Sequence, residues 1–110
     1  MIHGYTGGPK EIEPLLRYLQ EHTKWRIEVP VLTGHGEKLE LDEVTYEEWL
    51  EDAEKALLEL KKECDTVYII GFSMGGMIAA YLAAHHEIDK LVLLSPARKY
   101  LSFKYLSQYI

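Results

Sequence analysis

The stretch Thr66-Val-Tyr-Ile-Ile-Gly71-Phe-Ser73-Met-Gly75-Gly76-Met-Ile-Ala-Ala-Tyr-Leu-Ala-Ala84 decides the fold of this 110-residue chain. Its first five residues are apolar on both faces, as in a strand buried in the middle of a parallel sheet. Residues 77–84 are rich in good helix formers. The glycines between these segments therefore lie at a turn from a strand into a helix.

Ser73 occupies the centre of that turn, in the pattern Gly71-x-Ser73-x-Gly75. Such a string arises by chance in a chain of this length on the order of a few per cent of the time, so the string alone is a weak signal. Its place between a buried strand and a helix strengthens it, because a sharp turn there projects the serine hydroxyl above the sheet. Ser73 is the candidate nucleophile, and a purely structural turn is the alternative.

Strand and helix patterns alternate along the rest of the chain, which favours an α/β fold with a parallel sheet and covering helices. The pattern predicts a strand ending at Ile2, a helix whose apolar stripe runs over 12–19, a strand at 25–32, a helix opened by the capping box at 45–48, and a strand from Lys90. The tail over 98–110 carries aromatic residues at roughly helical spacing. It is either an amphipathic helix packed on the body or part of a lid.

The loop His3-Gly4-Tyr5-Thr6-Gly7-Gly8 also follows a strand end directly. Acyl transfer needs two backbone N–H groups aimed at the oxygen that becomes negative, and loss of one donor typically costs about 10²- to 10³-fold in rate. Met74, the residue after the candidate nucleophile, supplies one N–H at a helix N-terminus. Tyr5 is the expected second donor, although a Gly-rich loop ahead of a helix is more often only a turn.

Composition excludes several other classes of function. The formal charge of −6 comes from 18 acidic and 12 basic residues without a long run of either sign, so nucleic acid is a poor partner. No apolar stretch approaches the roughly 20 residues that span a bilayer. Cys64 is the single cysteine, which excludes a disulfide within the chain. We therefore expect a cytoplasmic protein without a membrane span.

Four motifs together resemble the α/β-hydrolase superfamily, in particular its bacterial carboxylesterase and monoacylglycerol-lipase-like branch. They are His-Gly-Tyr-Thr-Gly-Gly at 3–8, Gly-His-Gly at 34–36, Gly-Phe-Ser-Met-Gly-Gly at 71–76 and Leu-Leu-Ser-Pro at 93–96. The resemblance implies Ser73 as nucleophile and the Tyr5 and Met74 backbone N–H groups as the oxyanion hole. It also implies a short acyl or monoacylglycerol ester as the small-molecule substrate, with no metal or organic cofactor.

The sequence departs from that family in the other two members of the catalytic triad. In the family the acid and the histidine follow the serine on loops after later strands. Here the only histidines after Ser73 are His85 and His86, at the end of a helix that places them about 16 Å away, and the only Asp is Asp89 behind them. None of these residues is expected to act with Ser73.

We therefore expect a partial α/β-hydrolase fold, truncated at both ends, with residues 1–97 as a partial core and 98–110 as the beginning of a cap. The leading hypothesis is an incomplete piece of a serine hydrolase acting on carboxylic esters. The alternatives are a non-catalytic binding or assembly remnant, or a thioesterase, acyltransferase or peptidase of the same superfamily. Because only two residues of the strand between 25–32 and 66–71 are present, we also expect a gap in the sheet and self-association through its open edge.

Overall fold

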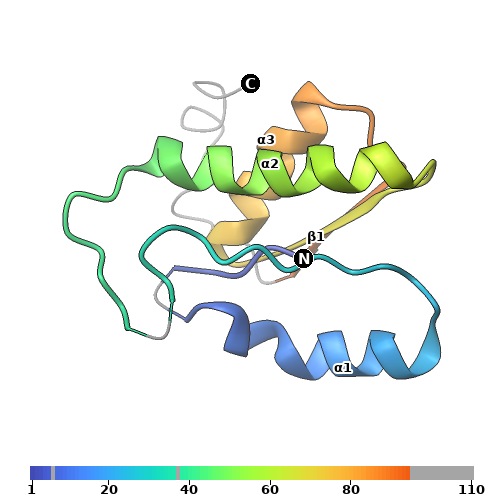
Figure 1. Ribbon diagram of the computed structural model, residues 1–110, viewed down its shortest axis with the longest axis horizontal. Coiled ribbons are helices and arrows are strands. Elements are labelled where there is room, and N and C mark those ends of the chain that lie inside the picture. Colours follow the sequence, from blue (N-terminus) through green and yellow to red (C-terminus); the bar gives the residue numbers. More distant parts are fainter. Residues whose placement is uncertain (6, 37, 95–110) are drawn as a thin grey trace.

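The computed structural model describes residues 1–5, 7–36 and 38–94 (Figure 1). In chain order the elements are the 3₁₀ helix η1 (Pro9–Ile12), α1 (Glu13–His22), α2 (Tyr46–Glu63), β1 (Tyr68–Phe72), α3 (Met74–His85) and β2 (Lys90–Leu94). Helices α2 and α3 lie on one side of the strands and α1 lies on the other (Figure 1). The expected cap over 98–110 falls outside the described residues.

The strands β1 and β2 pair in parallel, in a register that runs from Tyr68 opposite Lys90 to Phe72 opposite Leu94. Ile2 pairs with the opposite edge of β1: its N–H donates to the Ile70 carbonyl at 2.8 Å and its carbonyl accepts from Phe72 N–H at 2.9 Å. The predicted α/β class with a parallel sheet and covering helices is therefore confirmed.

The helices begin where the sequence predicts. Pro14 lies in the first turn of α1, where its missing N–H leaves no intrahelical bond unmade. Thr45 caps α2, because its Oγ1 accepts a hydrogen bond from Glu48 N–H at 3.3 Å. The buried residues of α2 are Trp49, Leu50, Ala53 and Leu57, and they belong to one core cluster with Ile69 of β1 and Ile78 of α3.

Helix α3 is the centre of the core. Its residues Met77, Ile78, Ala79 and Leu82 are at most 2% exposed, whereas no residue of α1 is fully buried. A helix that is apolar on all sides must be covered on all sides. The first half of α3, from Met74 to Ala79, meets this condition between α2 and the sheet, whereas Ala84 and His85 at its end are exposed. Ser73 therefore directly precedes the buried half of the helix.

The predicted strand at 25–32 is wrong: the structure assigns no strand between Thr23 and Leu32. A strand is defined by its backbone pairing, and this segment makes one such contact with the sheet region, from the Met1 nitrogen to the Glu28 carbonyl at 2.8 Å. Pro30 has no N–H to donate, and Trp25 and Val31 are more than half exposed. The residues have the composition of a strand but lack a neighbouring strand over most of their length.

Two glycines of the turn allow α3 to pack directly on the strands. A Cβ atom at Gly71 would lie 2.7 Å from the Gly76 Cα and 2.8 Å from the Ala79 Cβ, and one at Gly75 would lie 2.8 Å from the Ile2 carbonyl carbon. These distances are below van der Waals contact, and the closest groups are backbone atoms that cannot rotate away. Gly71 and Gly75 are therefore required by packing as well as by the turn.

We expect Gly71→Ala to lower the free energy of unfolding by about 1–3 kcal/mol, because the added methyl group forces α3 away from β1. Urea denaturation followed by circular dichroism measures the change. Gly36→Ala is the matched control, since a Cβ at Gly36 meets no atom within 4 Å. Equal stability of the two variants would show that the close approach at Gly71 is not needed.

Candidate active site

Ser73 links the end of β1 to the first turn of α3 in a sharply bent conformation. Its φ and ψ angles are 55° and −120°, a positive-φ region that non-glycine residues rarely adopt. The backbone is held on both sides, because Ser73 N–H donates to the Leu94 carbonyl and the Ser73 carbonyl accepts from Gly76 N–H, each at 2.9 Å. Strained backbone of this kind persists where the surroundings fix it, and it is concentrated at functional sites.

Met74 is the first residue of α3 and lies next to Ser73. The first N–H groups of a helix have no intrahelical acceptor, and the helix dipole places partial positive charge at the same end. No side-chain cap occupies this N-terminus, because Ser73 makes no capping hydrogen bond. The start of α3 therefore offers backbone donors to a negatively charged oxygen beside Ser73.

The loop that contains Tyr5 lies against the same turn. A Cβ atom at Gly4 would be 3.1 Å from the Ser73 Cβ and 3.3 Å from the Phe72 carbonyl oxygen. A Cβ at residue 4 would crowd the serine, so Gly4 helps the 3–5 backbone to pass this close to it. The structure thus brings the two predicted sources of N–H donors, the Tyr5 loop and the start of α3, to one place.

His3 fixes the base of this loop. Its ring is fully buried, and Nε2 accepts a hydrogen bond from Leu32 N–H at 3.1 Å while Nδ1 lies 2.8 Å from the Gly4 carbonyl. Because a backbone N–H can only donate, Nε2 must be unprotonated and Nδ1 carries the proton. Burial lowers the pKa of His3 below its ordinary value of 6.5. The hydrogen bond to the Gly4 carbonyl opposes this change, and nearby His35 adds to it. Both ring nitrogens are occupied, so His3 is a structural residue and not a base for Ser73.

A cluster of aromatic rings packs against the Tyr5 side chain. The His35 ring is 4.8 Å from that of His3, and the Tyr5 ring packs edge-on against Trp49 at 5.7 Å. His35 is 3% exposed, and its ring lies 5.5 Å from that of Trp49. The structure thus places the histidine of the Gly-His-Gly motif at 34–36 in this cluster.

Polar contacts attach this cluster to α2, and the sequence analysis missed them. Trp49 Nε1 donates to the Thr33 carbonyl at 2.8 Å, while Thr33 N–H and Oγ1 both donate to Asp52 Oδ2, at 2.7 and 2.6 Å. The signal available in the sequence is the three-residue spacing of Trp49 and Asp52, which places both on one face of a helix. These two residues fix the 33–36 loop on which the Tyr5 loop packs.

The residues excluded from the triad lie at the far end of α3 and have other partners. His85 Nδ1 is 2.9 Å from the Tyr81 carbonyl, and His86 Nε2 is 2.9 Å from Glu54 Oε2. Asp89 accepts a hydrogen bond from Val67 N–H at 2.7 Å, at the start of β1 rather than at its end. Within 1–5, 7–36 and 38–94, the structure also groups no three His, Cys, Asp or Glu side chains in a way that could hold a metal ion.

None of the helices in the described part of the chain is long and apolar enough to cross a bilayer.

Comparison with known proteins places this geometry in a family. A family profile described as the alpha/beta hydrolase fold matches residues 1–108. The thermostable monoacylglycerol lipase of Bacillus sp. (strain H-257) is 34% identical over 87 residues, which are 78% of this chain and 34% of the lipase. A solved structure from work on LipS and LipT, two metagenome-derived lipolytic enzymes, superposes with a TM-score of 0.81 at 27% identity and covers 92% of this chain and 42% of its own. This chain spans about a third of the length of the Bacillus lipase, and it belongs to the α/β-hydrolase family.

Proposed function

We propose that this chain is the nucleophile-bearing part of a serine hydrolase that acts on carboxylic esters. The observation that carries the proposal is Ser73 itself, a non-glycine residue with φ 55° between β1 and α3. The 3–5 loop and the N-terminus of α3, where Ser73 makes no side-chain capping hydrogen bond, border the same residue. The relatives named above are lipolytic, which supports esters as the substrate class.

In the proposed reaction the Ser73 hydroxyl oxygen attacks the ester carbonyl carbon. The carbonyl oxygen becomes negative and accepts hydrogen bonds from the Tyr5 and Met74 N–H groups. A histidine base takes the hydroxyl proton and returns it to the leaving alcohol as the C–O bond breaks, because a serine hydroxyl is a weak nucleophile without such a base. Water then releases the acid from the acylated serine by the same steps.

The base is the component that the described residues do not supply. His3 uses both ring nitrogens in the scaffold, and His85 and His86 lie at the opposite end of α3. The proposal therefore places the triad acid and histidine outside the residues that the structure describes. For the substrate it assigns a short acyl ester or a monoacylglycerol, since the Bacillus relative is a monoacylglycerol lipase.

A second candidate is a non-catalytic binding or assembly module that keeps the scaffold of the fold. It is favoured by the absence, among residues 1–5, 7–36 and 38–94, of a histidine placed to act on Ser73. It does not account for the strained backbone at Ser73 or for the N-terminus of α3 left without a capping side chain. The ester hydrolase remains the better supported function.

Covalent labelling with a fluorophosphonate distinguishes the two candidates. The probe is applied to this chain with imidazole added as a small-molecule base, and to a chimera that joins the chain to the flanking segments of the Bacillus lipase. We expect labelling that imidazole accelerates, that is strongest in the chimera, and that Ser73→Ala abolishes. Ser107→Ala is the matched serine control and should label like the parent. Labelling that survives Ser73→Ala would refute the assignment.

A further inference from the structure

Helix α2 holds the backbone of Thr33 through three hydrogen bonds, although Thr33 is exposed. Its N–H and Oγ1 donate to Asp52 Oδ2 at 2.7 and 2.6 Å, and its carbonyl accepts from Trp49 Nε1 at 2.8 Å. Hydrogen bonds to a carboxylate are roughly twice as strong as those between neutral groups. Both backbone polar groups of Thr33 are therefore attached to one face of α2.

Leu32 connects Thr33 to His3. It directly precedes Thr33, is fully buried, and donates its N–H to His3 Nε2 at 3.1 Å. Because Nε2 accepts this bond, the ring proton is on Nδ1, which donates to the Gly4 carbonyl at 2.8 Å. The Leu32 N–H thus selects the tautomer of His3 that can hold Gly4.

The peptide group between Gly4 and Tyr5 is the end of this series of contacts. Its carbonyl belongs to Gly4, and its N–H belongs to Tyr5. The C=O and N–H bonds of a planar trans peptide point in opposite directions. The bond that fixes the Gly4 carbonyl toward His3 therefore also fixes the direction of the Tyr5 N–H, on the side away from the His3 ring.

We propose that Asp52 is a positioning residue for the oxyanion hole. Through Thr33 and Leu32 it fixes the place of the His3 ring. The ring in turn fixes the peptide group that carries the Tyr5 N–H. The catalytic part of this proposal rests on the proposed function, in which the Tyr5 N–H stabilises the negative oxygen; the positional part does not.

A small displacement of the Tyr5 N–H is enough to affect the reaction. Donors of an oxyanion hole act at about 2.7–3.1 Å from the negative oxygen. A misplacement of about 1 Å can cost about 10²-fold in rate. Trp49 also packs its ring edge-on against Tyr5, so the loss of Asp52 shifts the loop without releasing it. We therefore expect a partial loss of rate and not a complete one.

Two substitutions of Asp52 separate the acceptor from the charge. Both Thr33 bonds go to the same oxygen, Oδ2, so the amide oxygen of Asp52→Asn can accept both of them. Asp52→Ala removes the acceptor. Because Thr33 is exposed, water satisfies its N–H and hydroxyl groups in the alanine variant, and the chain still folds.

Nuclear magnetic resonance of the 110-residue chain tests the positional part. In Asp52→Ala, hydrogen exchange at the Leu32 amide should become about tenfold faster or more. The ring nitrogen signals of His3 should move toward those of a mixture of tautomers, and Asp52→Asn should restore both readouts. The amide of Ile78, in the core of α3, reports global unfolding. An equal increase in exchange at Ile78 would mean a general loss of stability and would overturn the proposal.

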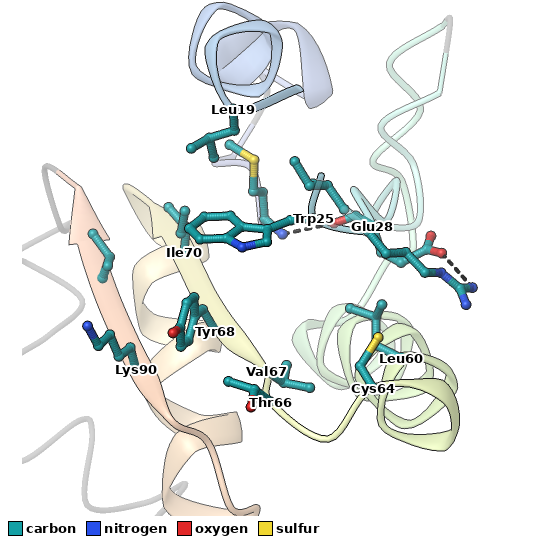
Figure 2. A pocket seen from close by; sticks show the side chains of 14 residues that line it. Leu19, Trp25, Glu28, Leu60, Cys64, Thr66, Val67, Tyr68, Ile70 and Lys90 are labelled. Carbon is teal, nitrogen blue, oxygen red and sulfur yellow. Dashed lines mark hydrogen bonds and ion pairs between the residues drawn. The ribbon is translucent and has the colours of Figure 1, made fainter. Parts of the chain in front are cut away.

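Two further substitutions on α2 serve as matched controls. Glu51→Ala removes an exposed carboxylate next to Asp52. Leu60→Ala removes an apolar side chain about 12 Å further along α2, where Leu60 lines a cavity between β1 and the segment 25–28 (Figure 2). Leu60→Ala should lower the stability of the chain, but both controls should leave the His3 signals unchanged. The same change of the His3 signals in either control would show that any disturbance of α2 has this effect and would overturn the role of Asp52.

Fluorophosphonate labelling with added imidazole tests the catalytic part. The labelling rate of Ser73 should fall by about tenfold to 10²-fold in Asp52→Ala and recover in Asp52→Asn, and both controls should label like the parent. Unchanged His3 and Leu32 signals in Asp52→Ala would overturn the proposal itself. Altered signals with unchanged labelling would refute Tyr5 as an oxyanion donor and so overturn the catalytic part. Absence of labelling in the parent chain would refute the proposed function, while the magnetic resonance result would still decide the positional part.

Discussion

The 110-residue chain on its own is expected to hydrolyse p-nitrophenyl esters about 10⁴- to 10⁶-fold more slowly than a complete serine hydrolase. Removing one member of a catalytic triad commonly lowers kcat by that amount, because the serine then has no group to take its proton. Steady-state release of p-nitrophenol at neutral pH measures the rate, with the Bacillus monoacylglycerol lipase as the complete enzyme for comparison.

The Ser73→Ala variant is the control, because it shows whether any remaining hydrolysis depends on the serine. Residues that act as a unit have strongly non-additive effects. Removal of the serine should therefore cause little further loss in the hydrolysis rate, which is already minimal. Steady hydrolysis that disappears in Ser73→Ala would contradict the account. It would mean that a described group, such as His3 or His35, takes the proton after all.

The stability of the chain is expected to fall by about 2–3 kcal/mol as the pH is lowered from above 8 to below 6. Burial lowers the pKa of the Met1 amino group from 8.0 to about 6, against a smaller opposing effect of Glu28. As the pH falls through this range the unfolded chain takes up the proton first, so protonation favours unfolding. The lowered pKa of the buried His3 ring acts in the same direction below pH 6.5.

Urea denaturation at pH 5.5 and pH 8.5 measures this difference in the free energy of unfolding. The matched control is the chain acetylated at its amino terminus, which has no amine to titrate and should lose correspondingly less stability at low pH. An equal loss in the free and acetylated chains would show that the Met1 amino group is not responsible.

Much of the fold follows from local sequence signals. The turn at Ser73 was predictable because a two-sided apolar strand, closely spaced glycines and a helix-forming segment all indicate the same element. The start of α2 was predictable because Thr45 and Glu48 form a local capping pattern that depends on no distant contact. In these segments local preference and tertiary packing agree, which is why the structure confirms them.

The segment 25–32 could not be predicted in this way. Alternation of Ile27, Val29 and Val31 indicates a strand, but whether a strand forms depends on a partner that only the tertiary structure supplies. The same is true of the bonds from His3 to Leu32 and from Asp52 to Thr33, which join residues 29 and 19 positions apart. Periodicity is a local property, so it does not indicate contacts between residues that are this far apart in the sequence.

The most direct measurement of the central claim is a crystal structure of the chain after reaction with a fluorophosphonate. The account predicts a covalent bond from phosphorus to Ser73 Oγ, with the phosphonyl oxygen about 2.7–3.1 Å from the backbone nitrogens of both Tyr5 and Met74. An adduct on another residue, or a phosphonyl oxygen turned to solvent away from these two N–H groups, would contradict it.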